Sequence, residues 1–112
     1  MKVSTTSAEH YIWGDGCDGW HLVKRPSLGV ISERMPPGTA EVRHLHHESR
    51  QFFFVLNGVA TLEMNTEQHK LVAREGLEIP PGVPHQIFNN GNEPLEFLVV
   101  SQPHSHGDRE LV

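Results

Sequence analysis

The sequence predicts an all-β protein. Short runs in which apolar and polar residues alternate recur along the 112 residues, and turn residues separate these runs at close intervals. Ten glycines and eight prolines are in keeping with many turns, and no stretch shows a sustained helical period with caps.

The expected elements follow one another with little chain between them. Strands are predicted over residues 28–35, 41–46, 51–56, 60–64, 70–73, 77–79, 85–89 and 95–101. The breaks carry Pro36-Pro37-Gly38, Asn57-Gly58, Asn65-Thr66, Pro80-Pro81-Gly82 and Asn89-Asn90-Gly91. We expect three parts: an N-terminal arm over residues 1–22, a barrel over 23–101 and a polar C-terminal tail over 102–112.

Length and charge restrict the class of protein. A chain of 112 residues forms one domain and buries about two-thirds of its unfolded surface. The formal charge of −5 argues against nucleic-acid binding, and no apolar stretch reaches the length of a membrane span. A single cysteine rules out an internal disulfide, and the first residues lack the apolar core of a signal peptide, so a cytoplasmic location is predicted.

Three histidines stand where they can meet. His44 and His46 are two residues apart, so in an extended strand both side chains point to the same face. His85 follows the rigid turn Pro80-Pro81-Gly82 and can approach from a neighbouring strand. Imidazole nitrogen is a ligand for zinc, nickel, copper and iron, and geometry selects among them more than affinity does. These residues predict a small β-barrel that holds one divalent metal ion in its interior.

The residues around the first two histidines resemble the first motif of the cupin family. That motif consists of a glycine, five residues, His-x-His, three or four residues, a glutamate, six residues and a glycine. Gly38, His44, His46 and Gly58 occupy these places here, and Gln51 stands where the family has its glutamate.

The residues around the third histidine resemble the second cupin motif: a glycine, five residues, Pro-x-Gly, two residues, a histidine, three residues and an asparagine. Pro80-Pro81-Gly82, His85 and Asn89 fit this spacing. Arg74 takes the place of the family's first glycine, and the nearest glycine is Gly76. We expect this departure to alter the turn before the strand and to leave the metal site unchanged.

The resemblance covers about residues 25–101. It implies a double-stranded β-helix (jelly-roll) cupin barrel in which His44, His46, Gln51 and His85 bind one divalent transition metal, such as zinc, iron, nickel or manganese. Small cupins commonly pair through their sheets, so the resemblance also implies a homodimer.

The function that the resemblance implies is that of a metalloenzyme acting on a small oxygen-bearing organic molecule, as an oxygenase, cyclase or isomerase. The set of three histidines and one glutamine is similar to that of cupin-type aromatic polyketide cyclases, in which zinc acts as a Lewis acid. The alternatives are a non-catalytic module that binds a small, sugar-like ligand and a storage or structural relic. The sequence does not identify catalytic residues beyond the ligands, and it carries no nucleotide, phosphate or coenzyme motif.

Gln51 sets the electrostatics of the predicted site. Its amide oxygen is a neutral ligand, so four neutral ligands would leave the full charge of a divalent ion to act on a substrate oxygen. Glu48 is the rival fourth ligand, because it shares strand parity with the two histidines, although a bend there would leave it in solvent. His47 has the opposite parity and is expected to point away.

Three further expectations concern the surroundings of the site. Phe53 and Ile87 are expected to make a mostly apolar wall near the metal. Few acid–base groups are expected in the barrel beyond Glu33 and Glu48. Phe52 and Phe54 are expected to face outward as a dimer surface. The second His-x-His, His104-Ser105-His106, is expected to fold over the barrel mouth without binding metal.

Overall fold

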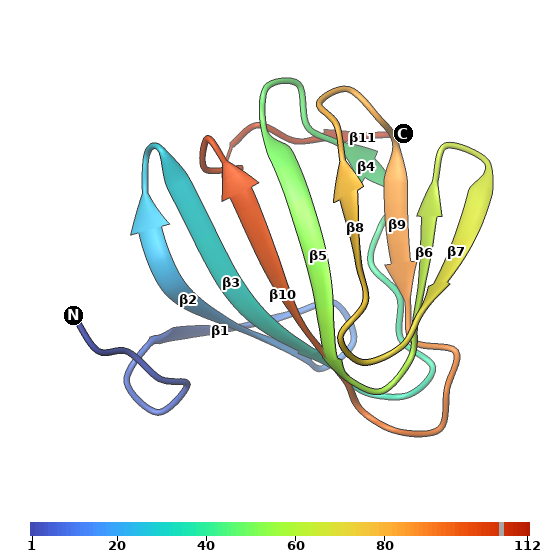
Figure 1. The fold of residues 1–112 in the computed structure, drawn as a ribbon, viewed down its shortest axis with the longest axis horizontal. Helices are drawn as coiled ribbons and strands as arrows, with labels where there is room; N and C mark the ends of the chain where they lie inside the picture. The colour runs from blue at the N-terminus through green and yellow to red at the C-terminus, as the bar shows by residue number, and fades with distance from the viewer. Residues whose placement is uncertain (106) are drawn as a thin grey trace.

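Eleven β-strands build the protein in the computed structural model, which describes residues 1–105 and 107–112 (Figure 1). Within these ranges no helix occurs, so the expected all-β class is confirmed. The strands are β1 (Glu9–Trp13), β2 (Cys17–Arg25), β3 (Leu28–Met35), β4 (His44–Leu45), β5 (Arg50–Asn57), β6 (Ala60–Met64), β7 (Glu67–Leu71), β8 (Gly76–Ile79), β9 (His85–Phe88), β10 (Leu95–Gln102) and β11 (Glu110–Leu111).

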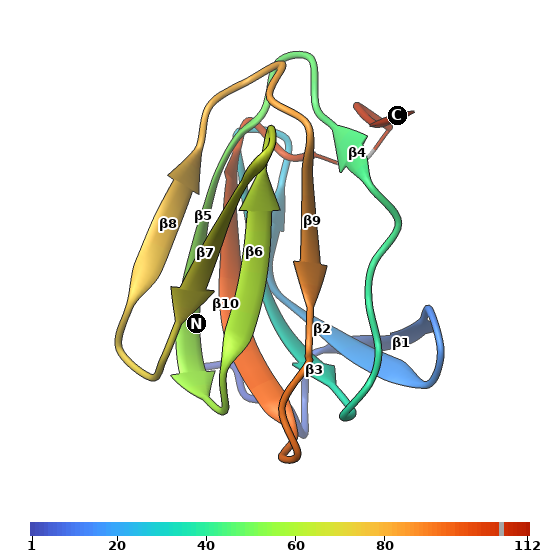
Figure 2. The ribbon, with the colours of Figure 1, turned by 90° about the vertical axis from the view of Figure 1, so that its right-hand side faces the viewer.

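The strands form two sheets that face each other. One sheet has the order β1-β2-β3-β10-β5-β8, and the other has the order β11-β4-β9-β6-β7. Every pairing between named strands is antiparallel, and strands that are distant in sequence, such as β3 and β10, lie side by side. Figure 2 shows the two layers edge-on, with β4 and the C-terminus near one end of the barrel, which we call its mouth. This is the double-stranded β-helix, or jelly roll, that was expected.

Alternation along the central strands separates the core from the surface. In β5, Gln51, Phe53 and Val55 are buried, and Phe52 between them is exposed. β10 follows the same rule, and its inward residues meet those of β5 and β3. The apolar core between the sheets consists of Cys17, Met35, Phe53, Val55, Ala60, Leu62, Leu71, Ile79, Ile87, Leu95, Phe97 and Val99.

The N-terminal segment, expected as an arm over residues 1–22, contains β1 and most of β2. These strands extend the six-stranded sheet through the pairing of β2 with β3. Two features explain why the sequence of these strands shows no regular alternation of apolar and polar residues. A register shift between His21 and Val23 breaks the alternation. Gly19 is required because the ring of Tyr11 lies where a side chain would be. The division into arm, barrel and tail remains a prediction.

The segment expected as a strand over residues 41–46 is mostly irregular. Only His44–Leu45 are in β4, with one isolated bridge between Ala40 and Phe88 before them. The C-terminal segment returns to this edge, where β11 pairs with β4. No helix in the described part of the chain is long and apolar enough to cross a membrane.

Candidate metal centre

Three buried imidazoles converge inside the barrel near its mouth. His44 lies on β4 and is directly paired with His85, the first residue of β9. His46 follows one residue after β4. One side-chain nitrogen from each ring lies within 4.8 Å of those of the other two, so a single ion can contact all three. The strand pairing thus brings together the three histidines that the sequence predicted to meet.

Backbone carbonyls orient all three rings. The Nδ1 atoms of His44 and His85 lie 2.8 and 2.9 Å from the carbonyl oxygens of Val42 and Val83, each two residues earlier in the chain. The Nδ1 atom of His46 lies 2.6 Å from the carbonyl oxygen of Asp108. When Nδ1 donates to a carbonyl, the proton is placed on that atom and Nε2 keeps its lone pair, which is how protein metal ligands are commonly prepared.

Burial keeps these imidazoles neutral. Removal from water lowers the pKa of His44 to about 3 and that of His85 to about 4. The pKa of His46 is lowered for the same reason, although its contact with Asp108 acts in the opposite direction. Because only the neutral ring can bind a metal, near neutral pH no proton has to be removed before a metal binds.

Gln51 enters the centre from β5 in the other sheet. Its Nε2 donates to Ser101 Oγ at 3.0 Å, which turns the amide oxygen Oε1 toward His85 Nε2 at 3.1 Å. Both the glutamine and the serine are buried. Three imidazole nitrogens and one amide oxygen, all neutral, form a donor set that suits zinc, iron or nickel. The residues therefore fit a divalent ion, and their assignment as its ligands remains a prediction.

The loop between β8 and β9 is tied to the first pair of histidines. The backbone N–H of Gly82 donates to the carbonyl oxygen of His46 at 2.7 Å. Gly82 has a φ of 79°, in the left-handed region that glycine reaches without strain. A glycine at this position of the second motif therefore allows the backbone conformation in which the loop is hydrogen-bonded to the first motif.

The rival ligands lie outside the centre. Glu48 and His47 are exposed, and His47 Nε2 faces a carboxylate oxygen of Glu110 at 3.5 Å. His104 lines the neighbouring cavity, whereas His106 lies outside the described residues.

A cavity of about 540 Å³ opens in front of His44, His46 and Gln51. Phe53 and Ile87, expected to form an apolar wall, are buried in the core and do not line this cavity, although the ring of Phe53 lies 5.9 Å from that of His85. Apolar atoms make up more of the cavity surface than polar atoms, while most of the lining side chains are polar or charged. The expectation of few acid–base groups is wrong. Besides the centre, the walls include Glu9, Tyr11, His21, Lys24, Ile31, Glu33, Glu41, Val99, His104 and Arg109. Many of them come from β1, β2 and the C-terminal segment, which the sequence did not place at the site.

Two carboxyl groups, those of Glu33 and Glu41, share this cavity. Burial raises the pKa of Glu33 well above its usual value, and Glu41 adds to the shift while Arg109 opposes it. Burial raises the pKa of Glu41 to about 8, again against the charge of Arg109. Glu41 Oε1 lies 4.0 Å from Nδ1 of His44, so proton-carrying groups stand beside the metal centre.

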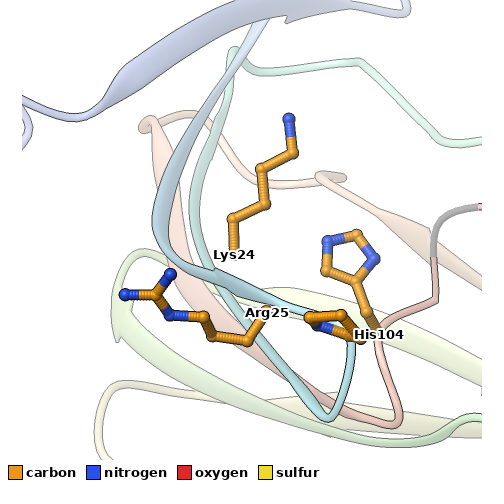
Figure 3. A pocket seen from close by; sticks show the side chains of 4 residues that line it. Lys24, Arg25 and His104 are labelled. Carbon is orange, nitrogen blue, oxygen red and sulfur yellow. The ribbon is translucent and has the colours of Figure 1, made fainter.

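A second hollow, of about 400 Å³, is lined by Lys24, Arg25, Pro26 and His104, of which Lys24 and His104 also line the central cavity. Figure 3 shows the side chains of Lys24 and Arg25 pointing in different directions, so their charges do not converge. Lys24 Nζ donates to both carboxylate oxygens of Glu9, at 3.1 and 3.2 Å. The hollow therefore lacks the convergent groups of the central cavity.

Comparison with known sequences identifies the family. A family model described as Cupin domain matches residues 31–101. The uncharacterized protein MJ1618 of Methanocaldococcus jannaschii is 33% identical over 93 residues, which are 82% of this chain and 74% of the relative. Other curated relatives are longer proteins, of which this chain spans 16% to 36%.

Solved structures agree with the sequence match. A sugar phosphate isomerase of the cupin superfamily from Silicibacter pomeroyi has a TM-score of 0.81 at 27% identity, over 93% of this chain and 76% of that one. The polyketide cyclase RemF from Streptomyces resistomycificus has a TM-score of 0.86 over 100% of this chain and 84% of that one. The identity to RemF is 19%, so this likeness shows the fold alone. From the two motifs, the jelly-roll fold and the matching family model, we conclude that the chain belongs to the cupin family.

Proposed function

We propose that this cupin is a metal-dependent enzyme of the isomerase or cyclase type, acting on a small, polar, oxygen-bearing molecule. One observation carries the proposal: His44 and His46, two of the three clustered imidazoles, line the same cavity as the carboxyl groups of Glu33 and Glu41. A metal ligand set beside groups that can move protons is the inventory that such a reaction needs.

The ion would be held by His44, His46 and His85 through Nε2 and by Gln51 through Oε1. A divalent ion in this set supplies Lewis-acid polarisation of a substrate oxygen, undiminished by any anionic ligand. The remaining tasks, binding, orientation and proton transfer, fall to the other residues of the cavity.

Glu33 and Glu41 are the groups best placed to move a proton. The pKa of Glu41, raised by burial to about 8, allows the carboxyl both to give and to accept a proton near neutral pH. A substrate whose carbonyl oxygen faces the three histidines would place its neighbouring C–H or O–H group toward this wall. Isomerisation and cyclisation both require a proton to leave one atom and arrive at another.

The polar side chains in the lining support a substrate with several oxygens. The phenol of Tyr11, the pair formed by Lys24 and Glu9, and the guanidinium of Arg109 all reach the cavity. Hydroxyl or acid groups of a ligand would find hydrogen-bond partners there. The likeness to a sugar phosphate isomerase at 27% identity also supports this class of substrate.

Solvent deuterium exchange tests the proposal. Protein loaded with zinc, manganese, nickel or iron(II) is incubated in D₂O with a panel of hydroxyaldehydes, hydroxyketones, oxo acids and 1,3-dicarbonyl compounds. We expect one compound class to gain deuterium beside its carbonyl group, with the rate falling at least ~10²-fold in Glu33→Gln or Glu41→Gln, as for loss of a general acid–base group.

Binding without turnover is the competing function, and the same cavity would suit it as well. Cobalt(II)-substituted protein separates the two. If a compound shifts the cobalt absorption spectrum but gains no deuterium with any metal, the protein is a binding module. If no compound does either, the enzyme proposal and its substrate class both fail.

A further inference from the structure

The C-terminal segment forms a strap across the barrel mouth. We use "strap" for residues 103–112, of which 103–105 and 107–112 are described. Its backbone is tied to the barrel at both ends: His104 N–H donates to the carbonyl oxygen of Pro26 at 3.1 Å, and Val112 N–H donates to that of Arg43 at 3.3 Å. β11, within the strap, pairs with β4, and Figure 1 shows the two side by side near the C-terminus.

One residue of the strap, Asp108, contacts four consecutive residues of the loop that carries the metal centre. Its carboxylate accepts hydrogen bonds from the backbone N–H groups of His47, Glu48 and Ser49, at 3.0, 2.9 and 2.9 Å. Its carbonyl oxygen lies 2.6 Å from Nδ1 of His46. Hydrogen bonds to an ionised acceptor are among the stronger ones, so Asp108 fixes the loop and the ring together.

The three imidazoles of the centre differ in where their orienting carbonyl comes from. For His44 and His85 it belongs to the residue two positions earlier, on the same piece of chain. For His46 it belongs to Asp108, 62 residues away. The orientation of His46 therefore depends on whether the strap is docked, and that of the other two rings does not.

We propose that Asp108 is a positioning residue of the metal centre and that the strap completes this centre, so that metal binding and strap docking stabilise each other. The inference rests on the metal site of the proposed function. Because the two equilibria are linked, a change that destabilises the docked strap must weaken metal binding. Bound metal must stabilise the docked strap by the same free energy.

The strap also forms part of the substrate cavity, because His104, Ser105, Gly107 and Arg109 line it. A docked strap thus orients one ligand and closes one wall at the same time. Metal loss is expected to open that wall.

The experiment measures the strap with and without metal. Full-length wild type, Asp108→Ala, Asp108→Asn and Glu110→Gln are compared by zinc competition titration and by amide hydrogen exchange at residues 47–49. Glu110 is the matched control, because it is an acidic strap residue whose carboxylate faces the exposed His47. Asp108→Ala keeps the backbone carbonyl that faces His46 and removes the carboxylate that holds the loop and this carbonyl in place. We expect it to lower zinc affinity by about 10-fold or more, as when the orienting contact of a metal ligand is disturbed, and Glu110→Gln to leave the affinity unchanged. Asp108→Asn, which keeps the shape, should fall between them.

The coupling between metal binding and strap docking can also be measured in the wild type, by amide hydrogen exchange. Zinc should slow amide exchange at residues 47–49, and His85→Ala, which leaves the strap contacts intact, should abolish that effect. Wild-type zinc affinity in Asp108→Ala, or exchange that zinc does not change in a wild type that binds it, would overturn the proposal.

A metal-free measurement separates this inference from the proposed function. The ¹⁵N shifts of the His46 imidazole should show the Nδ1–H form in the wild type and a mixture of forms in Asp108→Ala. If this holds but no metal binds, the proposed function fails and the positioning role of Asp108 stands. If the Nδ1–H form persists unchanged in Asp108→Ala, the positioning role fails whatever the metal does.

Discussion

Gln51 and His85 face each other in the candidate metal centre, with the amide oxygen Oε1 3.1 Å from the imidazole Nε2. Nδ1 of the same ring lies 2.9 Å from the carbonyl oxygen of Val83. A neutral imidazole has a single N–H, so in either tautomer one of these contacts brings two acceptors together. The pKa of His85, lowered to about 4, excludes a second proton near neutral pH. A cation between Nε2 and Oε1 removes the conflict, because it accepts an electron pair from both atoms.

The first prediction follows from this contact. Gln51→Glu places an anionic oxygen where the neutral amide oxygen stands, so the affinity for divalent zinc should rise by at least ~10-fold, or ~1.4 kcal/mol. Gln51→Leu, which has no oxygen, should lower it. Competition titration with a chelator measures both, and equal affinities in all three proteins would show that residue 51 does not bind the metal.

Adjacent histidines provide the second prediction. His46→Ala should abolish stoichiometric metal, because it removes one of the three imidazoles. His47→Ala should not, because that side chain is 59% exposed and faces Glu110. Elemental analysis gives the metal content, and circular dichroism checks that both variants keep the β-fold. Full metal content in folded His46→Ala would contradict the assignment.

Where alternation was regular and turn residues were clear, the sequence predicted the fold closely. The strand bounds expected over residues 28–35 and 60–64 are those of β3 and β6. The three histidines were found because strand parity and one rigid turn are local patterns. Their meeting is the consequence of pairing β4 with β9.

The sequence did not predict that the acid–base groups of the cavity and the residues of the strap lie at the site. Tyr11 reaches the cavity only because β1 is added to the sheet edge by pairing with β2, and a register shift between β2 and β3 breaks the alternation of β2. Asp108 and Arg109 act across about 60 residues of chain, through hydrogen bonds to backbone and through charge. The local alternation of residues does not predict such contacts, because they form only when the folded barrel places the C-terminal segment beside residues 41–49.

The third prediction concerns Glu33 and pH. Its pKa is raised in the folded protein, so between the unfolded value near 4.5 and the folded value the native state binds more protons. Stability should therefore fall as pH rises through that window, by up to ~1.4 kcal/mol per pH unit for one group. Glu33→Gln removes this slope. Urea unfolding of metal-free protein from pH 5 to 8 should show the wild type losing stability relative to the variant, and parallel curves would refute the shift.

The fourth prediction concerns Arg74, which stands where the family has glycine. Its φ is 72°, the left-handed region, and its N–H donates to the carbonyl oxygen of Val55 at 2.8 Å. Arg74→Gly relieves a strain of ~1–2 kcal/mol but adds freedom to the unfolded chain, so the free energy of unfolding should rise by up to ~1 kcal/mol. Arg74→Ala keeps the strain and should show no gain.

Gly76 gives the opposing case for the same turn. A Cβ there would lie 2.7 Å from the carbonyl oxygen of Phe53, so Gly76→Ala should lower the free energy of unfolding. Urea denaturation compares the three variants. A gain for Arg74→Ala equal to that for Arg74→Gly would assign the effect to the lost side chain instead of the backbone.

The fifth prediction is the homodimer. On the outer face of the six-stranded sheet, Phe52 is 40% exposed, its ring stacks on Phe54 with centroids 6.1 Å apart, and Leu56 is 47% exposed. A second copy would cover the aromatic pair, and the loss of a central aromatic typically costs an interface more than ~1 kcal/mol.

Phe52→Lys should therefore shift the protein to monomer in light scattering at micromolar concentration. Val72→Lys, at a site that is 43% exposed elsewhere, should leave the mass unchanged. A monomeric wild type would overturn this assignment.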